Sequence, residues 1–582
     1  MKFLHNVLAT LVALFVFSVL GFLFLIALVG IMSADKKTSI SENSILHLRL
    51  KKPIAERSIE DPFDGFLIKG SAAIGILDLK EAIQHAKEDE NIAGIYLDTK
   101  FIMAGFGHAE ELRNALEDFK SSGKFIIAWS DLMSEGSYYI CSVADSIFLH
   151  PEGDLEFNGL AYTLSFFKGT FEKLDIEPQI FRVGDYKSAV EPFMRKDMSD
   201  ENRVQVASFI GDIYGRITKD IASSRGLDNK TVNDISSGLL VRKVEDAVDL
   251  GLIDDLRYYD EIEDILREIS GLEEDEKINL VTLNKYLKSF EQKSSSKNRI
   301  AVIMASGEIV FGEGEQGNIG SEKFTKEIRK ARKSSRVKAI VLRINSPGGN
   351  FIASDELWRE VYLASQEKPV IASMSNYAAS GGYYMAMAAD TIIAYPNTIT
   401  GSIGIFSILF NISGFLENKL GITSDVVKTG EYSDILTVSR PLTDYEKSIF
   451  QKQAENGYKT FITKAAEGRG MSVEEISKIA SGRVWTGSQA LENGLVDMLG
   501  TFDDAVRIAA EKAGIEDDYK LRYYPVQKSF WEQLLADFGQ DVKAKLIRAN
   551  VGELYPYIEI LKKLENYQGV QARMPYELHT GF

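Results

Sequence analysis

The chain has 582 residues, of which 45% are hydrophobic and 26% charged, and its formal net charge at pH 7 is -17. This length exceeds what one hydrophobic core supports, so we expect at least two domains. The negative charge argues against binding to the phosphate backbone of nucleic acids. The single cysteine, Cys141, excludes an intramolecular disulfide and a cysteine-cluster metal site. Histidine is absent between residues 151 and 578, so a histidine-rich metal site is not expected either.

An apolar run follows the short N-terminal segment 1–6. Residues 7–32 are almost wholly hydrophobic. Such a run is long enough to cross a hydrocarbon core about 30 Å thick. It is also longer than the apolar region of a cleaved secretory signal, which has about 7–15 residues. We therefore predict an uncleaved transmembrane signal anchor. Lys2 lies before the run and Lys36 and Lys37 lie behind it, so the charges give no orientation.

The rest of the chain contains an internal repeat. Residues 124–151 align with residues 368–396, and Tyr138 falls on Tyr383 in this alignment. We predict two homologous halves, an N-terminal domain over 45–295 and a C-terminal domain over 298–545, with a polar link over 273–297. A tail over 546–582 lies outside the duplication.

Each half alternates short apolar runs with helical patterns. In the second half, residues 300–304 and 339–344 have the composition of buried strands, and residues 321–334 between them have the pattern of an amphipathic helix. Alternation of strands and helices is typical of an α/β domain with a largely parallel sheet. We predict this fold class for both halves.

A serine in the second half lies on a predicted turn from strand to helix. The apolar run 369–372 precedes a group of small residues that contains Ser380, Gly381 and Gly382. Such a turn exposes a nucleophilic Oγ and directs backbone N–H groups at an oxyanion. The alternative is a close-packed helix start in which small residues merely fit. The repeat counterpart of Ser380 is Glu135, so the turn itself does not require a serine.

The first half carries a lysine where the second half carries a serine. Lys187 aligns with Ser433, and neither half keeps both a serine and a lysine at the two positions. This predicts one site shared across the halves; the alternative is random drift of two surface residues. A serine nucleophile needs a base, and a lysine serves if burial lowers its pKa. The negative charges of Asp185 and Glu191 would raise the pKa of Lys187, so we expect both side chains to point away from it.

Two further turns offer polar groups to this site. Gly348 and Gly349 follow a buried strand and present backbone N–H groups without side chains in the way, so we predict them, together with Gly381, as oxyanion-hole donors. The N–H of Ser380 itself is the alternative partner donor. Ser402, in the turn 400–404, is predicted to accept a hydrogen bond from Lys187 and to orient its amine.

Four motifs resemble those of the signal peptide peptidase A family in its long, tandem-domain form. They are N-S-P-G-G at 345–349, A-S-G-G-Y-Y at 379–384, T-G-S-I-G at 400–404 and G-D-Y-K-S-A-V-E-P-F at 184–193. The resemblance covers nearly the whole chain after the predicted anchor and implies Clp-protease/crotonase-like domains. It places Ser380 at the nucleophile and Lys187 at the general base, a Ser/Lys dyad made across the halves. It also places Ser402 at a serine that contacts the lysine, and Gly348 and Gly349 beside the oxyanion hole.

The resemblance further implies a membrane-anchored serine endopeptidase. Its substrates are apolar peptides such as cleaved signal peptides, and it forms a homo-tetramer at the outer face of the bacterial inner membrane. It needs neither a metal nor an organic cofactor and binds no nucleic acid. Two alternatives stay open. One is a crotonase-type acyl-thioester enzyme, although the basic cluster expected for its phosphates is not evident. The other is a catalytically inactive membrane scaffold, which needs neither Ser380 nor Lys187.

Overall fold

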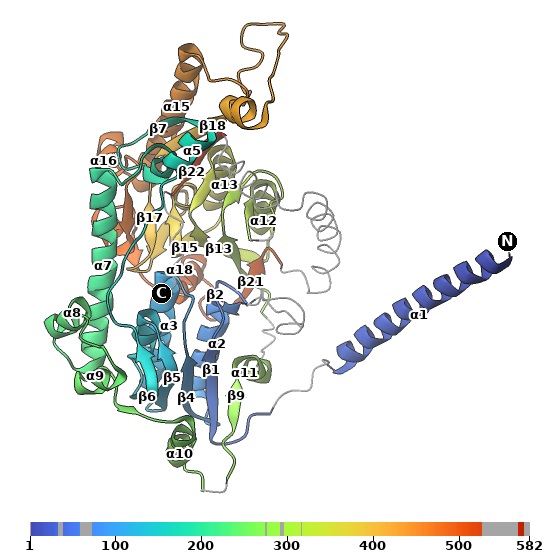
Figure 1. The fold of residues 1–582 in the computed structure, drawn as a ribbon. Helices are drawn as coiled ribbons and strands as arrows, with labels where there is room; N and C mark the ends of the chain where they lie inside the picture. Colours follow the sequence, from blue (N-terminus) through green and yellow to red (C-terminus); the bar gives the residue numbers. More distant parts are fainter. Residues whose placement is uncertain are drawn as a thin grey trace.

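The computed structural model describes residues 2–32, 39–58, 73–273, 276–290, 296–315, 317–526 and 569–574 (Figure 1). Most of the predicted tail therefore lies outside the described residues.

The N-terminal apolar run forms helix α1 (Lys2–Met32). The side chains of residues 22–32, which belong to the predicted anchor, lie outside the described residues. Within the part of the chain that was searched, none of the helices is long and apolar enough to cross a membrane. The transmembrane anchor over residues 7–32 stays a prediction.

The first half of the chain builds a six-stranded parallel sheet in the order β8-β6-β5-β4-β1-β9. Its strands are β1 (Ser44–Leu50), β4 (Ile92–Thr99), β5 (Phe125–Met133), β6 (Ser146–Leu155), β8 (Asp255–Leu256) and β9 (Leu280–Thr282). Its helices are α2 (Ile76–Glu88), α3 (Phe106–Lys120), α4 (Glu135–Cys141), α7 (Asp200–Arg225), α8 (Asn229–Ser237), α9 (Val244–Asp249), α10 (Tyr259–Ile269) and α11 (Leu283–Phe290). A short parallel pair, β2 (Ile54–Ala55) and β3 (Ile74–Gly75), forms a separate two-stranded sheet.

The segment predicted as a polar link is partly built into this first sheet. Strand β9 pairs with β1 in parallel, and Tyr286 on the following helix α11 is fully buried. The high content of charged residues hid a short strand whose central residue, Val281, is buried.

The second half builds an eight-stranded sheet, in which six strands correspond to those of the first sheet. Its order is β19-β17-β15-β13-β10-β21, and β16 pairs with both β15 and β20. Its strands are β10 (Arg299–Ser306), β13 (Val337–Ser346), β15 (Val370–Ala379), β16 (Thr391–Ala394), β17 (Ile399–Gly401), β19 (Val484–Thr486), β20 (Met498–Leu499) and β21 (Lys520–Tyr524). Its helices are α12 (Ser321–Lys333), α13 (Phe351–Ser365), α14 (Gly381–Ala386), α15 (Asp444–Arg469), α16 (Val473–Ile479), α17 (Gly487–Glu492) and α18 (Phe502–Ala513).

Corresponding strands occupy corresponding places in the two sheets. The series β20-β16-β15-β13-β10-β21 in the second half repeats β8-β6-β5-β4-β1-β9 in the first, and all of these pairs are parallel. The central strands are buried along nearly their whole length, as expected for parallel sheets that helices cover on both faces. The prediction of α/β halves with parallel sheets is confirmed.

A third sheet joins the two halves. Its order is β12-β11-β14-β22-β18-β7, with β7 (Glu177–Val183), β11 (Ile309–Val310), β12 (Ile319–Gly320), β14 (Gly348–Asn350), β18 (Ile405–Asn411) and β22 (Gly569–Arg573). Strand β7 of the first half pairs antiparallel with β18 of the second, from Val183 opposite Ile405 to Glu177 opposite Asn411. Figure 1 shows β7, β18 and β22 together. This pairing brings the segment after β7 against the second half.

Candidate active site

Ser380 lies in a tight turn between a strand and a helix. Strand β15 ends at Ala379 and helix α14 begins at Gly381, so the strand runs farther than the apolar run 369–372 indicated. The backbone of Ser380 has φ 55° and ψ -112°, a conformation that L-residues rarely adopt. Its N–H donates to the carbonyl oxygen of Gly401 at 2.8 Å, which holds the turn. The side chain of Ser380 is therefore fixed at the carboxyl end of a central strand.

Lys187 reaches Ser380 from the other half of the chain. It lies four residues after the end of β7, and the N–H of Tyr186 before it donates to the carbonyl oxygen of Ser481 at 3.0 Å. Lys187 Nζ is 2.9 Å from Ser380 Oγ. It is also 3.1 Å from both the carbonyl oxygen and Oγ of Ser402. The structure thus brings together the three side chains that the sequence singled out.

The surroundings of Lys187 favour a neutral amine. Its side chain is fully buried, and this burial lowers its pKa well below the ordinary value of 10.5. Among the described residues no carboxylate forms an ion pair with it. Glu191, whose negative charge could have raised the pKa of Lys187, instead accepts hydrogen bonds from Ser199 Oγ and Asn202 Nδ2 at 2.5 and 2.7 Å. A neutral amine has two N–H groups and one lone pair, so donation to the two oxygens of Ser402 leaves the lone pair for the proton of Ser380.

Two glycines that the sequence did not single out as site residues pack directly on Lys187. A Cβ at Gly482 would lie 2.6 Å from Cβ of Lys187, and Gly482 has φ +81°. A Cβ at Gly404 would lie 3.1 Å from Cδ of Lys187. Gly404 belongs to the T-G-S-I-G motif and was within reach of sequence reasoning, whereas Gly482 carries no local signal. A side chain at either position would therefore clash with Lys187.

The glycine-rich turn lies beside the helix that follows Ser380. A Cβ at Gly348 would lie 2.6 Å from the backbone nitrogen of Gly381, and Gly348 has φ +96°. The N–H of Gly348 donates to Ser346 Oγ at 3.2 Å, so this group is already engaged. Gly349 instead pairs with Ala572 of β22. The predicted oxyanion glycines thus come together, and Gly349 and Gly381 are the better candidates for donors.

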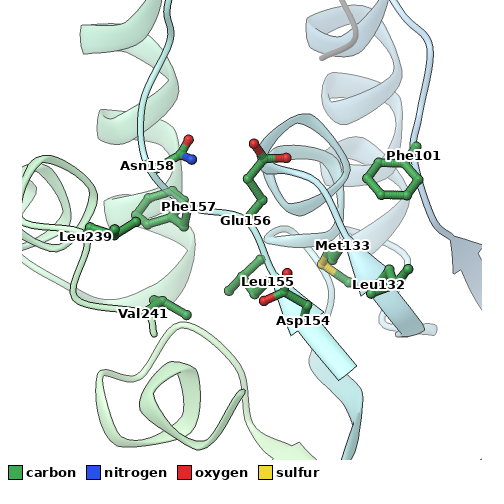
Figure 2. Close-up of a pocket in the computed structure, with 10 residues that line it drawn as sticks. All are labelled: Phe101, Leu132, Met133, Asp154, Leu155, Glu156, Phe157, Asn158, Leu239 and Val241. Carbon is green, nitrogen blue, oxygen red and sulfur yellow. The ribbon is translucent and has the colours of Figure 1, made fainter. Parts of the chain in front are cut away.

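The corresponding position in the first half has different contacts. Glu135 begins helix α4 and accepts hydrogen bonds from the Gly159 N–H and Tyr214 Oη, both at 2.8 Å. Burial raises its pKa. A pocket of about 300 Å³ lies nearby, with Phe101 at its rim (Figure 2). Neither a serine nor a lysine lines this pocket. Its side chains therefore do not offer the chemistry found around Ser380.

A buried ion cluster fixes the two halves relative to each other. Arg343 on β13 contacts Glu56 at 2.8 Å and Glu111 at 2.6 Å, and Lys80 contacts Glu111 at 2.9 Å. Burial by itself would raise the pKa of Glu111, but Arg343 and Lys80 lower it to about 2. The charged form of Glu111 thus stabilises the fold above the ordinary carboxyl pKa. This stability is lost as pH falls towards 2.

We expect the substitution Arg343→Met to lower the free energy of unfolding by about 3–5 kcal/mol, because it leaves Glu56 and Glu111 buried without their partner. Urea denaturation followed by circular dichroism measures this loss. The exposed Arg336, just before the same strand, supplies the control Arg336→Met, which should change the value by about 0.5 kcal/mol or less. Equal denaturation midpoints for the two variants would contradict a structural role of the cluster.

One family model matches both halves of the chain. The model described as peptidase family S49 matches residues 118–273, which contain Lys187, and 363–516, which contain Ser380. The protein named serine protease SPPA, chloroplastic, of Arabidopsis thaliana is 35% identical, over 92% of this chain and 78% of that protein. Protease 4 of Salmonella typhi is 37% identical, over 81% and 78% of the two chains. Protease 4 of Haemophilus influenzae is 32% identical, over 94% of each.

A solved structure of a ClpP1 mutant from Listeria monocytogenes covers 36% of this chain and 95% of its own, with a TM-score of 0.24 and 18% identity. A similarity at this level carries no argument. The Clp-protease/crotonase-like domain type thus stays a prediction.

Proposed function

Because the chain belongs to peptidase family S49, we propose that it is a serine endopeptidase in which Ser380 is the nucleophile and Lys187 the general base. The observation that carries this proposal is the distance of 2.9 Å between Lys187 Nζ and Ser380 Oγ, two atoms from different halves of the chain. Full burial of Lys187 supports it, because burial lowers the pKa of the amine and so favours its neutral form.

The geometry supports an acyl-enzyme mechanism. Ser380 Oγ attacks the peptide carbonyl carbon while neutral Lys187 accepts the hydroxyl proton. The N–H groups of Gly349 and Gly381 stabilise the oxyanion. The charged Lys187 then protonates the leaving amine, which departs. Water attacks the acyl-enzyme with Lys187 again as base, which releases the carboxylate product and restores Ser380.

Ser402 is proposed as a positioning residue. Both of its oxygens lie 3.1 Å from Lys187 Nζ, and its backbone has φ 51°, a conformation uncommon for serine. The Ser402 N–H donates to the carbonyl oxygen of Arg483 at 2.7 Å, which holds this conformation. The two contacts direct the amine at Ser380 and compensate for part of the cost of burying its N–H groups.

The proposed substrates are extended apolar peptides such as cleaved signal peptides. The strand position between β14 and β18 lies beside Ser380, and we propose that an extended peptide binds there by strand addition in place of β22, which holds the position in this structure. A homo-tetramer and a place at the outer face of the bacterial inner membrane are further proposals, which rest on the family resemblance. An acyl-thioester enzyme and an inactive scaffold remain the alternatives, and the match to a peptidase family favours neither.

A fluorophosphonate probe, which labels activated serines, tests the proposed pair. We expect the label on Ser380, identified by mass spectrometry of the digested protein. The labelling rate should rise as pH increases through the lowered pKa of Lys187 and level off well below pH 10.5, because only the neutral amine accepts the serine proton. A label on another serine, or a rate that rises only near the ordinary lysine pKa, contradicts the assignment.

A further inference from the structure

The C-terminal strand of the chain occupies the position between β14 and β18. Strand β22 runs antiparallel to β14, with Gly348 opposite Arg573, and antiparallel to β18, with Phe406 opposite Gln571. Residues 569–574 therefore lie in the proposed peptide groove as a peptide substrate would.

The register of β22 places one carbonyl group among the oxyanion glycines. The Met574 N–H donates to the carbonyl oxygen of Pro347 at 2.7 Å. In an antiparallel ladder, hydrogen-bonded residue pairs alternate with pairs that are not hydrogen-bonded. Gly348 pairs with Arg573, so Pro347 and Met574 form one hydrogen-bonded pair, and Gly349 and Ala572 form the next. We therefore infer that the Gly349 N–H donates to the carbonyl oxygen of Ala572. This oxygen also lies 3.1 Å from where a Cβ of Gly381 would be. The carbonyl of Ala572 thus occupies the place of the carbonyl that Ser380 would attack.

Alternate side chains of the strand face different surroundings. Ala572 and Val570 pack against the apolar core of the second half. Arg573, the residue on the leaving side of the bond, lies on the opposite face of the strand, because successive side chains alternate. Its Nη1 donates to Glu308 Oε1 at 2.7 Å, and their side chains are only 8% and 17% exposed. Glu308 lies in the short connection between β10 and β11.

We propose that Glu308 determines specificity on the leaving side of the scissile bond, so that the site prefers a small residue followed directly by a basic residue. The inference rests on the proposed peptidase function. A carboxylate held in a mostly buried place gains from a cationic partner and disfavours an anionic one. The segment Gly569–Met574 has this pattern, with Ala572 followed by Arg573, and it competes with added peptides for the groove.

Three quenched fluorescent peptides test the inference with the full-length chain. They have the sequence Gly-Val-Gln-Ala-X-Met, where X is arginine, alanine or glutamate. For the wild type we expect kcat/KM for the arginine peptide to exceed that for the alanine peptide by about 10-fold, as a charge-assisted contact provides. Glu308→Gln should remove most of this preference and leave the alanine peptide within about twofold of the wild type. Glu308→Lys should favour the glutamate peptide.

Two results would overturn the inference. One is equal kcat/KM of the wild type for the arginine and alanine peptides. The other is an equal loss on both peptides in Glu308→Gln, which is the sign of a structural role. Cleavage of the alanine peptide by the wild type shows separately that the protein is a peptidase, so a failure of the specificity rule is distinct from a failure of the proposed function.

The occupied groove gives a second, independent measurement. Arg573→Ala removes the contact with Glu308 and should weaken the hold of the C-terminal strand, so the fluorophosphonate probe should label Ser380 several-fold faster than in the wild type. Lys520→Ala, on a strand at the far edge of the second sheet, is the control and should leave the rate unchanged. An unchanged rate in Arg573→Ala shows that this contact does not hold the strand in the groove.

Discussion

The substitution Ser380→Ala is expected to abolish peptide hydrolysis, with a loss in kcat of about 10⁴-fold or more, because no acyl-enzyme forms without the hydroxyl. Alanine removes one buried oxygen and keeps the Cβ that the turn already accommodates. The denaturation midpoint should therefore stay near that of the wild type. Hydrolysis of a fluorogenic apolar peptide, followed at several enzyme concentrations, measures the loss.

Ser433→Ala is the matched control for this experiment. Ser433 is the repeat counterpart of Lys187, is exposed, and lies outside the groove. Its replacement should leave kcat within about twofold of the wild type, as is usual for surface positions. A folded Ser380→Ala protein that hydrolyses peptides at near wild-type rate would show that another residue is the nucleophile.

The substitution Lys187→Met should cause a loss in kcat of about 10³–10⁴-fold. Methionine has a similar length and suits the buried site, but it has no amine to accept the proton of Ser380 or to protonate the leaving group. The variant should also lose the rise of fluorophosphonate labelling with pH. This second readout separates loss of the base from a change in packing.

Lys196→Met is the control for Lys187→Met, since Lys196 is an exposed lysine nine residues farther along the same segment and pairs with Glu172 at the surface. We expect normal activity from it. If Lys187→Met keeps both its activity and the normal pH profile, the base is a different group and the pairing with Ser380 is only structural.

Much of the fold could be predicted from patterns in the sequence. Buried parallel strands are continuous apolar runs, and the expected strands at 300–304 and 339–344 lie within β10 and β13. The prediction was wrong where local composition misled. The charged segment 273–297 concealed β9, because a short edge strand needs only one or two buried residues. Strand β15 continues to Ala379, since its small residues pair with β17 rather than form a loop.

The candidate residues themselves came from the sequence, by comparison of the two repeats and by a family resemblance. Ser380, Lys187, Ser402 and the three glycines all carry local motifs. Local motifs do not show that Gly482 packs on Lys187 or that a strand fills the groove. Each of these depends on the path of a backbone segment that contacts the site from elsewhere in the chain.

The sequence by itself determined the α/β alternation, the duplication, and the separation of a serine and a lysine between the halves, because these follow from periodicity and residue identity. The tertiary structure decided that Lys187 and Ser380, 193 residues apart, lie 2.9 Å from each other. It did so through the pairing of β7 with β18, which a sequence pattern does not specify because strand partners are chosen by long-range packing. The same pairing buries Lys187, and this burial lowers the pKa of its amine, as the proposed role of general base requires.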